Sequence, residues 1–212
     1  MIDKKAKSYI CYMQIAYGGY EIMNSPIKSS GSPSPKRAKS GQWALKPQDV
    51  VVALKLVVLR GERLTYEELG KRLKLSQFEA HAAAKRLVAA KLATEIEGEV
   101  RPIMATLKNF IYYGAPYAFP PVRGEMTIGF PTAYGVNPLK DKVLFADENP
   151  PVWPSAEGTT RGMTLLPLYE KAPLAAVEDK ALYEMLSLFD ALRIGAARER
   201  ELAIMFLEER LR

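Results

Sequence analysis

The chain has 212 residues, of which 48% are hydrophobic and 25% charged, a composition typical of a folded protein with one domain or two small ones. Its single cysteine excludes an internal disulfide, and one cysteine with one histidine cannot build a zinc site or a Cys–His nucleophile unless the two meet, so we predict no metal and no cofactor. Lys and Arg number 30 against 24 Asp and Glu, and the formal charge of +6 is typical of proteins that bind nucleic acid.

The positive charge is concentrated near the start of the chain. Residues 1–46 hold eight basic and two acidic residues, whereas the rest of the chain holds 22 of each sign. Residues 1–41 are also so rich in Ser, Pro, Gly and Lys that they cannot bury enough surface to offset the entropy of ordering. We therefore predict a disordered basic arm over residues 1–41.

No membrane-spanning or secretory segment is expected. The longest apolar run, residues 50–59, is interrupted by Lys55 and is shorter than the ~18 residues that a spanning helix needs. The apolar residues after Lys4 and Lys5 are interrupted by Gln14 and Gly18, so they do not form the core of a signal peptide. We therefore expect a cytoplasmic protein.

The second segment, residues 42–102, begins with a predicted helix and continues with two shorter ones. Pro47 suits the first turn of a helix, and valine and leucine residues at helical spacing continue to near Gly61. The motifs T-x-x-E at Thr65 and S-x-x-E at Ser76 are capping boxes, in which a hydroxyl and a carboxylate each satisfy a free N–H at a helix start. Only Lys74 and its neighbour separate the two helices, so we predict a tight turn and a helix-turn-helix.

The second helix of this pair is expected over residues 77–91. Its small apolar residues would pack inward, against the preceding helix. These residues are Ala80, Ala83, Ala84 and Leu87. The outer face would then carry Gln77, Phe78, His81, Ala82, Lys85 and Arg86. Two short β-prone segments around Gly98 follow, and they predict a β-hairpin.

Residues 45–102 resemble the winged helix-turn-helix domains of bacterial transcription regulators, including the MarR-like group. Residues 75–93 match the run that begins at the tight turn and ends at the entry to the wing. The resemblance implies a mainly α fold, with an N-terminal winged helix-turn-helix and a small β-hairpin wing. It also implies a sequence-specific DNA-binding regulator of transcription, acting on double-stranded DNA through a recognition helix near residues 77–91.

Local charge supports the same function. Residues 69–92 hold six basic residues and one acidic residue, a net charge of +5 in a region that would face a duplex. The predicted DNA-binding set is Lys71, Arg72, Ser76, Gln77, His81, Lys85 and Arg86. The lysines and arginines would hold phosphates, while Gln77, His81 and Lys85 would reach base edges. The alternative is that these cations are only the solvated faces of amphipathic helices, with His81 an ordinary surface or packed residue.

The third segment, residues 103–176, starts with a short apolar helix around Leu107 and Ile111 and then changes composition. Eleven prolines lie between residues 102 and 173, about three times the usual share of ~5%, and aromatic residues are interspersed among them. We predict an irregular but ordered segment that aromatic side chains pin in place. The strings RGEMTIGFPTA from Arg123, PPVWP from Pro150 and the later RG and PLY are similar to those of an uncharacterised bacterial family in which they follow a winged helix.

The last segment, residues 177–212, is expected to form two helices. Glu178 and Asp179 can open the first, whose broad apolar stripe ends at Gly195, and the second alternates apolar residues with charged ones. Winged-helix regulators often dimerise through helices outside the DNA-reading unit, because two-fold operators require a two-fold protein. We expect a homodimer through these helices, and the alternative is that they complete the core of the monomer.

Two functions from different classes remain. The first is the DNA-binding regulator, with the later segments sensing a signal or joining subunits. The second is a winged-helix adaptor or antitoxin-like partner of another protein, without strong DNA binding, that uses its proline-rich half as a surface. The acidic hairpin, with Glu95, Glu97 and Glu99, departs from the winged-helix pattern, because a hairpin that touches DNA is usually basic. An enzyme is the weakest hypothesis, since no paired-carboxylate motif is visible and we predict no catalytic residues.

Overall fold

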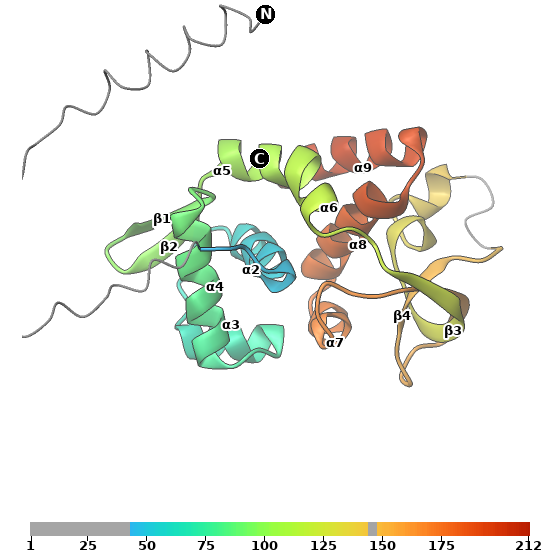
Figure 1. Ribbon diagram of the computed structural model, residues 1–212, viewed down its shortest axis with the longest axis horizontal. Coiled ribbons are helices and arrows are strands. Elements are labelled where there is room, and N and C mark those ends of the chain that lie inside the picture. The colour runs from blue at the N-terminus through green and yellow to red at the C-terminus, as the bar shows by residue number, and fades with distance from the viewer. Residues whose placement is uncertain (1–42, 144–147) are drawn as a thin grey trace, which may run out of the picture. The chain divides into compact units, whose positions relative to one another are not determined.

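The computed structural model describes residues 43–143 and 148–212 (Figure 1). All the described residues belong to one unit, Gly41–Arg212. The predicted basic arm over residues 1–41 therefore lies outside the described residues. Within the described residues the fold combines helices with two small sheets, of which only the first, a hairpin, was predicted. None of the described helices is long and apolar enough to cross a membrane.

The first described helix, α2 (Pro47–Val58), is buried along most of its length. Its apolar residues from Val50 to Leu54 are almost fully excluded from solvent. Lys55 is buried too, and its Nζ lies 2.5 Å from Oδ2 of Asp179 at the start of α8 (Lys180–Ile194). The lysine that interrupts the apolar run is therefore neutralised by an ion pair inside the fold.

The helices α3 (Tyr66–Leu73) and α4 (Gln77–Ala89) are joined by a tight turn. Both predicted capping boxes form, because Thr65 and Ser76 each accept the N–H of the glutamate three residues later. At the turn Lys74 adopts a left-handed backbone with φ of 55°. A Cβ atom at Gly70 would lie 2.8 Å from the carbonyl oxygen of Leu75, so the turn needs glycine at that position.

A two-stranded antiparallel hairpin follows α4, as predicted. It consists of β1 (Ala93–Ile96) and β2 (Glu99–Pro102), with Ile96 paired to Glu99. Glu97 and Gly98 form the two-residue loop and have φ angles of 51° and 77°. Positive φ at both loop positions is the requirement of a type I′ turn, which matches the twist of the flanking strands.

Beyond the hairpin, a single helical run changes its winding partway. It consists of α5 (Met104–Asn109), one π-helical turn η1 (Phe110–Gly114) and α6 (Ala115–Ala118). The run lies beside the last helix, α9 (Ala197–Arg210), where Glu208 accepts from Lys108 at 2.9 Å and from Tyr112 at 3.0 Å (Figure 1). The predicted short apolar helix is thus confirmed at Leu107 and Ile111, both of which are fully buried.

The prediction that residues 103–176 are irregular is wrong in one respect. They contain a small closed sheet of β3 (Arg123–Pro131), β4 (Pro151–Pro154) and β5 (Thr160–Leu165), along with the short helices η2 (Ala133–Gly135) and η3 (Lys140–Lys142). β3 pairs antiparallel with both other strands, and β4 pairs parallel with β5.

The prolines of this sheet explain the difference. Pro131, Pro151 and Pro154 lie at strand ends, where the absent N–H removes little of the ladder. Glycine allows the strands to approach closely, since a Cβ atom at Gly129 would lie 2.0 Å from the carbonyl oxygen of Trp153. A high proline content therefore limits the length of the strands without excluding a sheet.

The helix α8 joins the helices near the hairpin to the segment that contains the small sheet. It packs against α2 on one side and against η2, α7 (Ala172–Val177) and α9 on others, so the helices near the hairpin and the small sheet share one hydrophobic core (Figure 1). Its buried Asp190 accepts hydrogen bonds from Thr132 at 2.9 Å, Trp153 at 2.7 Å and Arg193 at 2.7 Å. Both predicted C-terminal helices are confirmed, with Asp179 and Gly195 at the ends of α8.

Candidate nucleic-acid interface

The inner and outer faces of α4 follow the predicted division at most positions. Ala80, Ala83, Ala84 and Leu87 are buried, with exposed fractions of at most 1%. On the opposite side Gln77 and His81 are exposed, and Phe78 is 85% exposed. The first two turns of α4 therefore present polar and aromatic side chains to solvent on a helix that its inner face holds in place.

Arg86 is the exception, and its predicted place on the outer face is wrong. Its side chain is directed inward, where Nε and Nη2 lie 2.7 and 2.6 Å from the two carboxylate oxygens of Asp49. Asp49 is 1% exposed and also accepts the backbone N–H of Lys46 at 2.8 Å, at the start of α2. The hydrogen bond to Asp49 raises the pKa of Arg86 above its usual value. Arg86 thus joins α4 to α2 and is not available to a phosphate.

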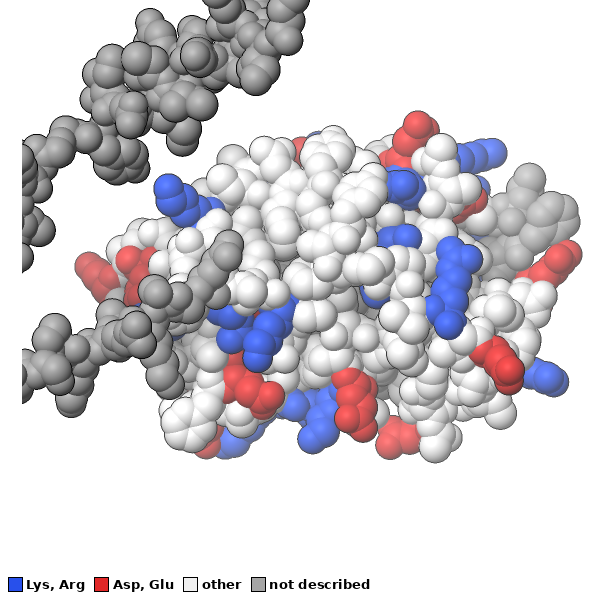
Figure 2. All heavy atoms as spheres, in the orientation of Figure 1, with Lys and Arg blue, Asp and Glu red and all other residues white. Residues whose placement is uncertain are grey.

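The remaining predicted phosphate contacts, Lys71, Arg72 and Lys85, each form an ion pair with a nearby carboxylate, and so does Lys74 in the turn. Lys71 pairs with Glu67 at 2.8 Å, Arg72 with Glu62 at 2.7 Å, Lys74 with Glu178 at 2.6 Å and Lys85 with Glu95 at 2.6 Å. The net +5 counted along the sequence is therefore offset locally by acids from other elements. Figure 2 shows the same mixture, with acidic side chains beside basic ones on the visible face.

These surface ion pairs are weak. The side chains of Lys71 and Arg72 are 73% and 42% exposed, and exposed pairs of this kind contribute about 0–1 kcal/mol. The hydrogen bonds that Lys71, Arg72 and Lys85 donate to their glutamate partners raise the pKa of all three cations, so the three side chains are charged at neutral pH. Each cation can therefore exchange its carboxylate for a phosphate oxygen at little cost.

The acidic hairpin is explained by what it contacts. Glu95 on β1 pairs with Lys85 of α4, while Glu99 on β2 pairs with Arg63 at 3.0 Å and with Arg101 at 2.8 Å. The hydrogen bond from Arg101 lowers the pKa of Glu99. Glu97 also lies 4.0 Å from Arg63, so the hairpin glutamates join the hairpin to α4 and to the loop before α3. Arg63 was not visible from the sequence because its partner Glu99 lies 36 residues further along the chain.

The Ser76 hydroxyl is used in helix capping, whereas the His81 side chain stays exposed. Ser76 is committed to its capping box, since its hydroxyl accepts the N–H of Glu79 and donates to the Glu79 carboxylate at 2.7 Å. The ring of His81 lies edge to face with Tyr66 of α3, with centroids 4.8 Å apart. This contact orients the ring while the side chain stays exposed, and the role of Tyr66 was not visible from the sequence.

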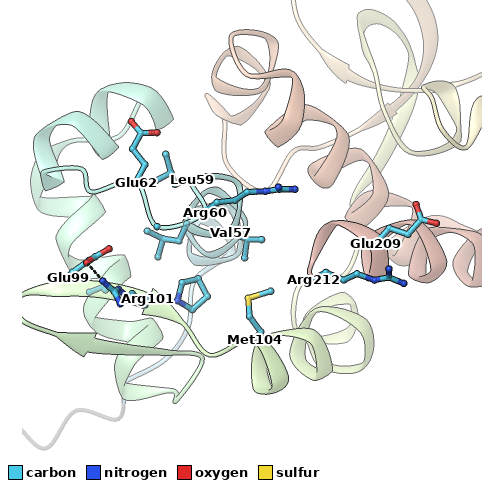
Figure 3. Close-up of a pocket in the computed structure, with 13 residues that line it drawn as sticks. Val57, Leu59, Arg60, Glu62, Glu99, Arg101, Met104, Glu209 and Arg212 are labelled. Carbon is cyan, nitrogen blue, oxygen red and sulfur yellow. Dashed lines mark hydrogen bonds and ion pairs between the residues drawn. The ribbon is translucent and has the colours of Figure 1, made fainter.

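A hollow of about 420 Å³ lies between the end of α2, strand β2 and the end of α9 (Figure 3). Val57, Leu59 and Met104 supply apolar lining, and Arg101 is hydrogen-bonded to Glu99 at its edge. Two further lining residues, Arg60 and Arg212, make no ion pair within the ranges 43–143 and 148–212. Glu62, Glu99 and Glu209 line the same hollow, so its acidic and basic lining residues are equal in number, and its volume is within the ~300–1,000 Å³ of small-molecule sites.

Comparison of the chain with protein-family models, with curated proteins and with solved structures found no match. Among the described residues, no three His, Cys, Asp or Glu side chains are grouped so that they could hold a metal ion.

Proposed function

We propose that this protein is a sequence-specific DNA-binding regulator of transcription whose recognition helix is α4. In a winged helix-turn-helix the second helix of the pair enters the major groove and its N-terminal residues contact base edges. The order α2, α3, tight turn, α4 and hairpin β1–β2 is the order that such a domain uses. This order supports the proposal, although a helix-turn-helix can also serve other functions.

The observation that carries the proposal is the uncommitted outer face at the start of α4. Gln77 and His81 are exposed, and neither forms a hydrogen bond with another side chain among the residues described. A glutamine side chain can pair with the N6 and N7 atoms of adenine, and an imidazole N–H can donate to a base acceptor. We assign these two residues to base recognition.

Three surface cations are assigned to phosphate contacts. Lys71 and Arg72 lie on α3 and Lys85 lies on α4, and their weak ion pairs can be exchanged for phosphate contacts. Arg86 is removed from the set because it is committed to Asp49. Three phosphate contacts predict a slope of about −3 per bound copy when the logarithm of the binding constant is plotted against the logarithm of the salt concentration.

The test is fluorescence anisotropy on a labelled duplex over a range of salt concentrations. Lys85→Ala should weaken binding and make the slope shallower by about 1. Gln77→Ala should lower affinity for the preferred sequence by roughly 5- to 150-fold while leaving affinity for random DNA unchanged. Lys142→Ala, at an exposed position in η3, is the matched control and should change neither. Full affinity in a Lys71→Ala/Lys85→Ala double variant would exclude this docking face.

A second function, an adaptor that binds another protein, is favoured by two observations. The cations around α4 are offset by carboxylates, and Phe78 is apolar yet 85% exposed at the start of that helix. An adaptor would co-purify with a stoichiometric protein partner and bind DNA no better than background at physiological salt. Phe78→Ala would then release the partner, whereas a DNA-binding regulator would show no such complex.

A further inference from the structure

Phe78 lies at the centre of the outer face of α4. The buried Leu87 follows it nine residues later, which is about two and a half turns of α-helix, so the two side chains point in opposite directions. Successive residues of an α-helix are about 100° apart, which places Gln77 and His81 to one side of this line and Ala82 to the other. The most outward side chain in the first two turns of α4 is therefore an apolar one.

The fold does not account for this side chain. Phe78 is 85% exposed, which is the highest fraction among the large apolar residues that the structure describes, and it lies outside their hydrophobic core. Phenylalanine is also a poorer helix former than alanine. Neither burial nor helix propensity explains an aromatic residue at this position, whereas contact with a bound molecule would explain it.

The residues around Phe78 leave its ring accessible. Glu79 is the acidic residue in the first turn of α4, and its carboxylate is turned back onto the helix cap. There it accepts the backbone N–H of Ser76 at 3.0 Å and the Ser76 hydroxyl at 2.7 Å. Ala82, one turn further along, is partly exposed and adds only a methyl group. The start of α4 therefore presents an apolar ring beside the amide of Gln77.

We propose that Phe78 contacts the C5-methyl group of a thymine in the major groove and thereby sets part of the sequence preference of the protein. This inference rests on the proposed DNA-binding function. A recognition helix directs the outward side chains of its first turns at base edges. The thymine methyl is the apolar group on those edges, and a phenylalanine ring has no hydrogen-bonding atom with which to read the others.

The position of Phe78 next to Gln77 limits where this thymine lies. Neighbouring Cα atoms are ~3.8 Å apart, close to the ~3.4 Å between successive base pairs. The two side chains therefore reach the same base pair or adjacent ones. Because Gln77 is assigned to an adenine, the methyl that meets Phe78 should belong to the thymine of that A·T pair or to a thymine in the next pair.

The experiment first selects a preferred sequence from a library of random duplexes with the purified full-length protein. Each thymine of that sequence is then replaced, one at a time, by deoxyuridine, which keeps the hydrogen-bonding groups of thymine and lacks only the methyl. Fluorescence anisotropy should show that the wild-type chain loses affinity about 4-fold at one or more of these positions, as expected for one methyl group removed from an apolar contact. Phe78→Ala should bind the thymine and deoxyuridine forms of that duplex equally.

Two further variants serve as controls. Phe78→Leu should retain part of the preference for thymine, because it keeps an apolar side chain at the same place. Ile128→Ala is the matched control, since it removes a large apolar side chain that is 54% exposed on the small sheet, and it should retain the full preference. Phe78→Ala should unfold at the same urea concentration as the wild-type chain, because Phe78 lies outside the core.

The outcomes separate this inference from the proposed function. If the wild-type chain selects a sequence but binds it equally well with deoxyuridine at every position, the role of Phe78 is overturned and the DNA-binding function stands. A preference for thymine that persists in Phe78→Ala would overturn the role of Phe78 as well. If no sequence is selected, the proposed function fails and the thymine contact fails with it.

Discussion

Replacing Arg86 distinguishes a structural residue from a DNA-binding one. Arg86→Ala removes two charge-assisted hydrogen bonds, of 2.7 and 2.6 Å, and leaves the carboxylate of Asp49 buried at 1% exposure without its cation. Breaking one side of a buried pair costs about 3–5 kcal/mol, which is a large part of the ~5–15 kcal/mol by which a typical protein is stable. The neighbouring Lys85→Ala breaks an exposed pair and should cost about 0–1 kcal/mol.

Urea unfolding of both variants, followed by circular dichroism and by the fluorescence of the buried Trp153, measures this difference. Asp49→Asn in the Arg86→Ala background should recover part of the lost stability, because it removes the lone buried charge. A loss of less than about 1 kcal/mol in Arg86→Ala, together with a fall in DNA affinity, would contradict the structural role and place Arg86 at the surface.

Three further outcomes are expected from urea unfolding. Ser76→Ala removes the cap of α4 and should lower the free energy of unfolding by about 1 kcal/mol. Hydrogen bonds from Ser76 lower the pKa of Glu79 in the folded protein. The stability that this capping box contributes is therefore complete above the usual pKa near 4.5 and is lost as the pH falls below it. The variant should therefore lose less stability than the wild-type chain between pH 5 and pH 3, and equal losses would contradict the assignment. Gly70→Ala should destabilise the fold, because its Cβ atom would lie 2.8 Å from the Leu75 carbonyl oxygen and the cost of this clash exceeds the ~1 kcal/mol that alanine usually gains over glycine in a helix. A stabilised variant would show that the turn can move. Asp190→Asn should cost about 3–5 kcal/mol because it leaves the buried Arg193 without its anion, and a neutral effect would show that Asp190 is already protonated in the fold.

The helices around α4 could be predicted because their signals are local. Each capping box lies within four residues, and the apolar spacing of α4 identified its inner face correctly at Ala80 and Leu87. The hairpin turn was also visible from Gly98 and its flanking β-prone residues. Each of these elements is determined by residues close to it in the sequence, so the sequence alone is enough to predict it.

Arg86 and the ion pairs could not be predicted in the same way. Arg86 lies at the boundary between the two faces of α4, and its inward direction depends on Asp49, 37 residues earlier. Asp49 has an obvious local role at the start of α2, which conceals its second one. The same is true of Lys85, whose partner is on the hairpin. Counting charges along the chain cannot show which cations another element neutralises.

The small sheet was missed although part of its signal was present. Met126, Ile128 and Phe130 alternate with smaller residues, which is the period of a strand, but the surrounding prolines indicated irregular structure. The partners of β3 lie more than 20 residues away, and close contacts at Gly129 make the pairing possible. Proline at the ends of short strands therefore deserves less weight against a sheet than proline within them.

The central claim is that α4 reads DNA, and selection of genomic fragments by the purified full-length protein tests it most directly. A small set of fragments with a shared sequence should be enriched at physiological salt, and Gln77→Ala should abolish this enrichment while Lys142→Ala retains it. Absence of any enriched fragment with a well-folded wild-type protein would contradict the claim and favour the adaptor.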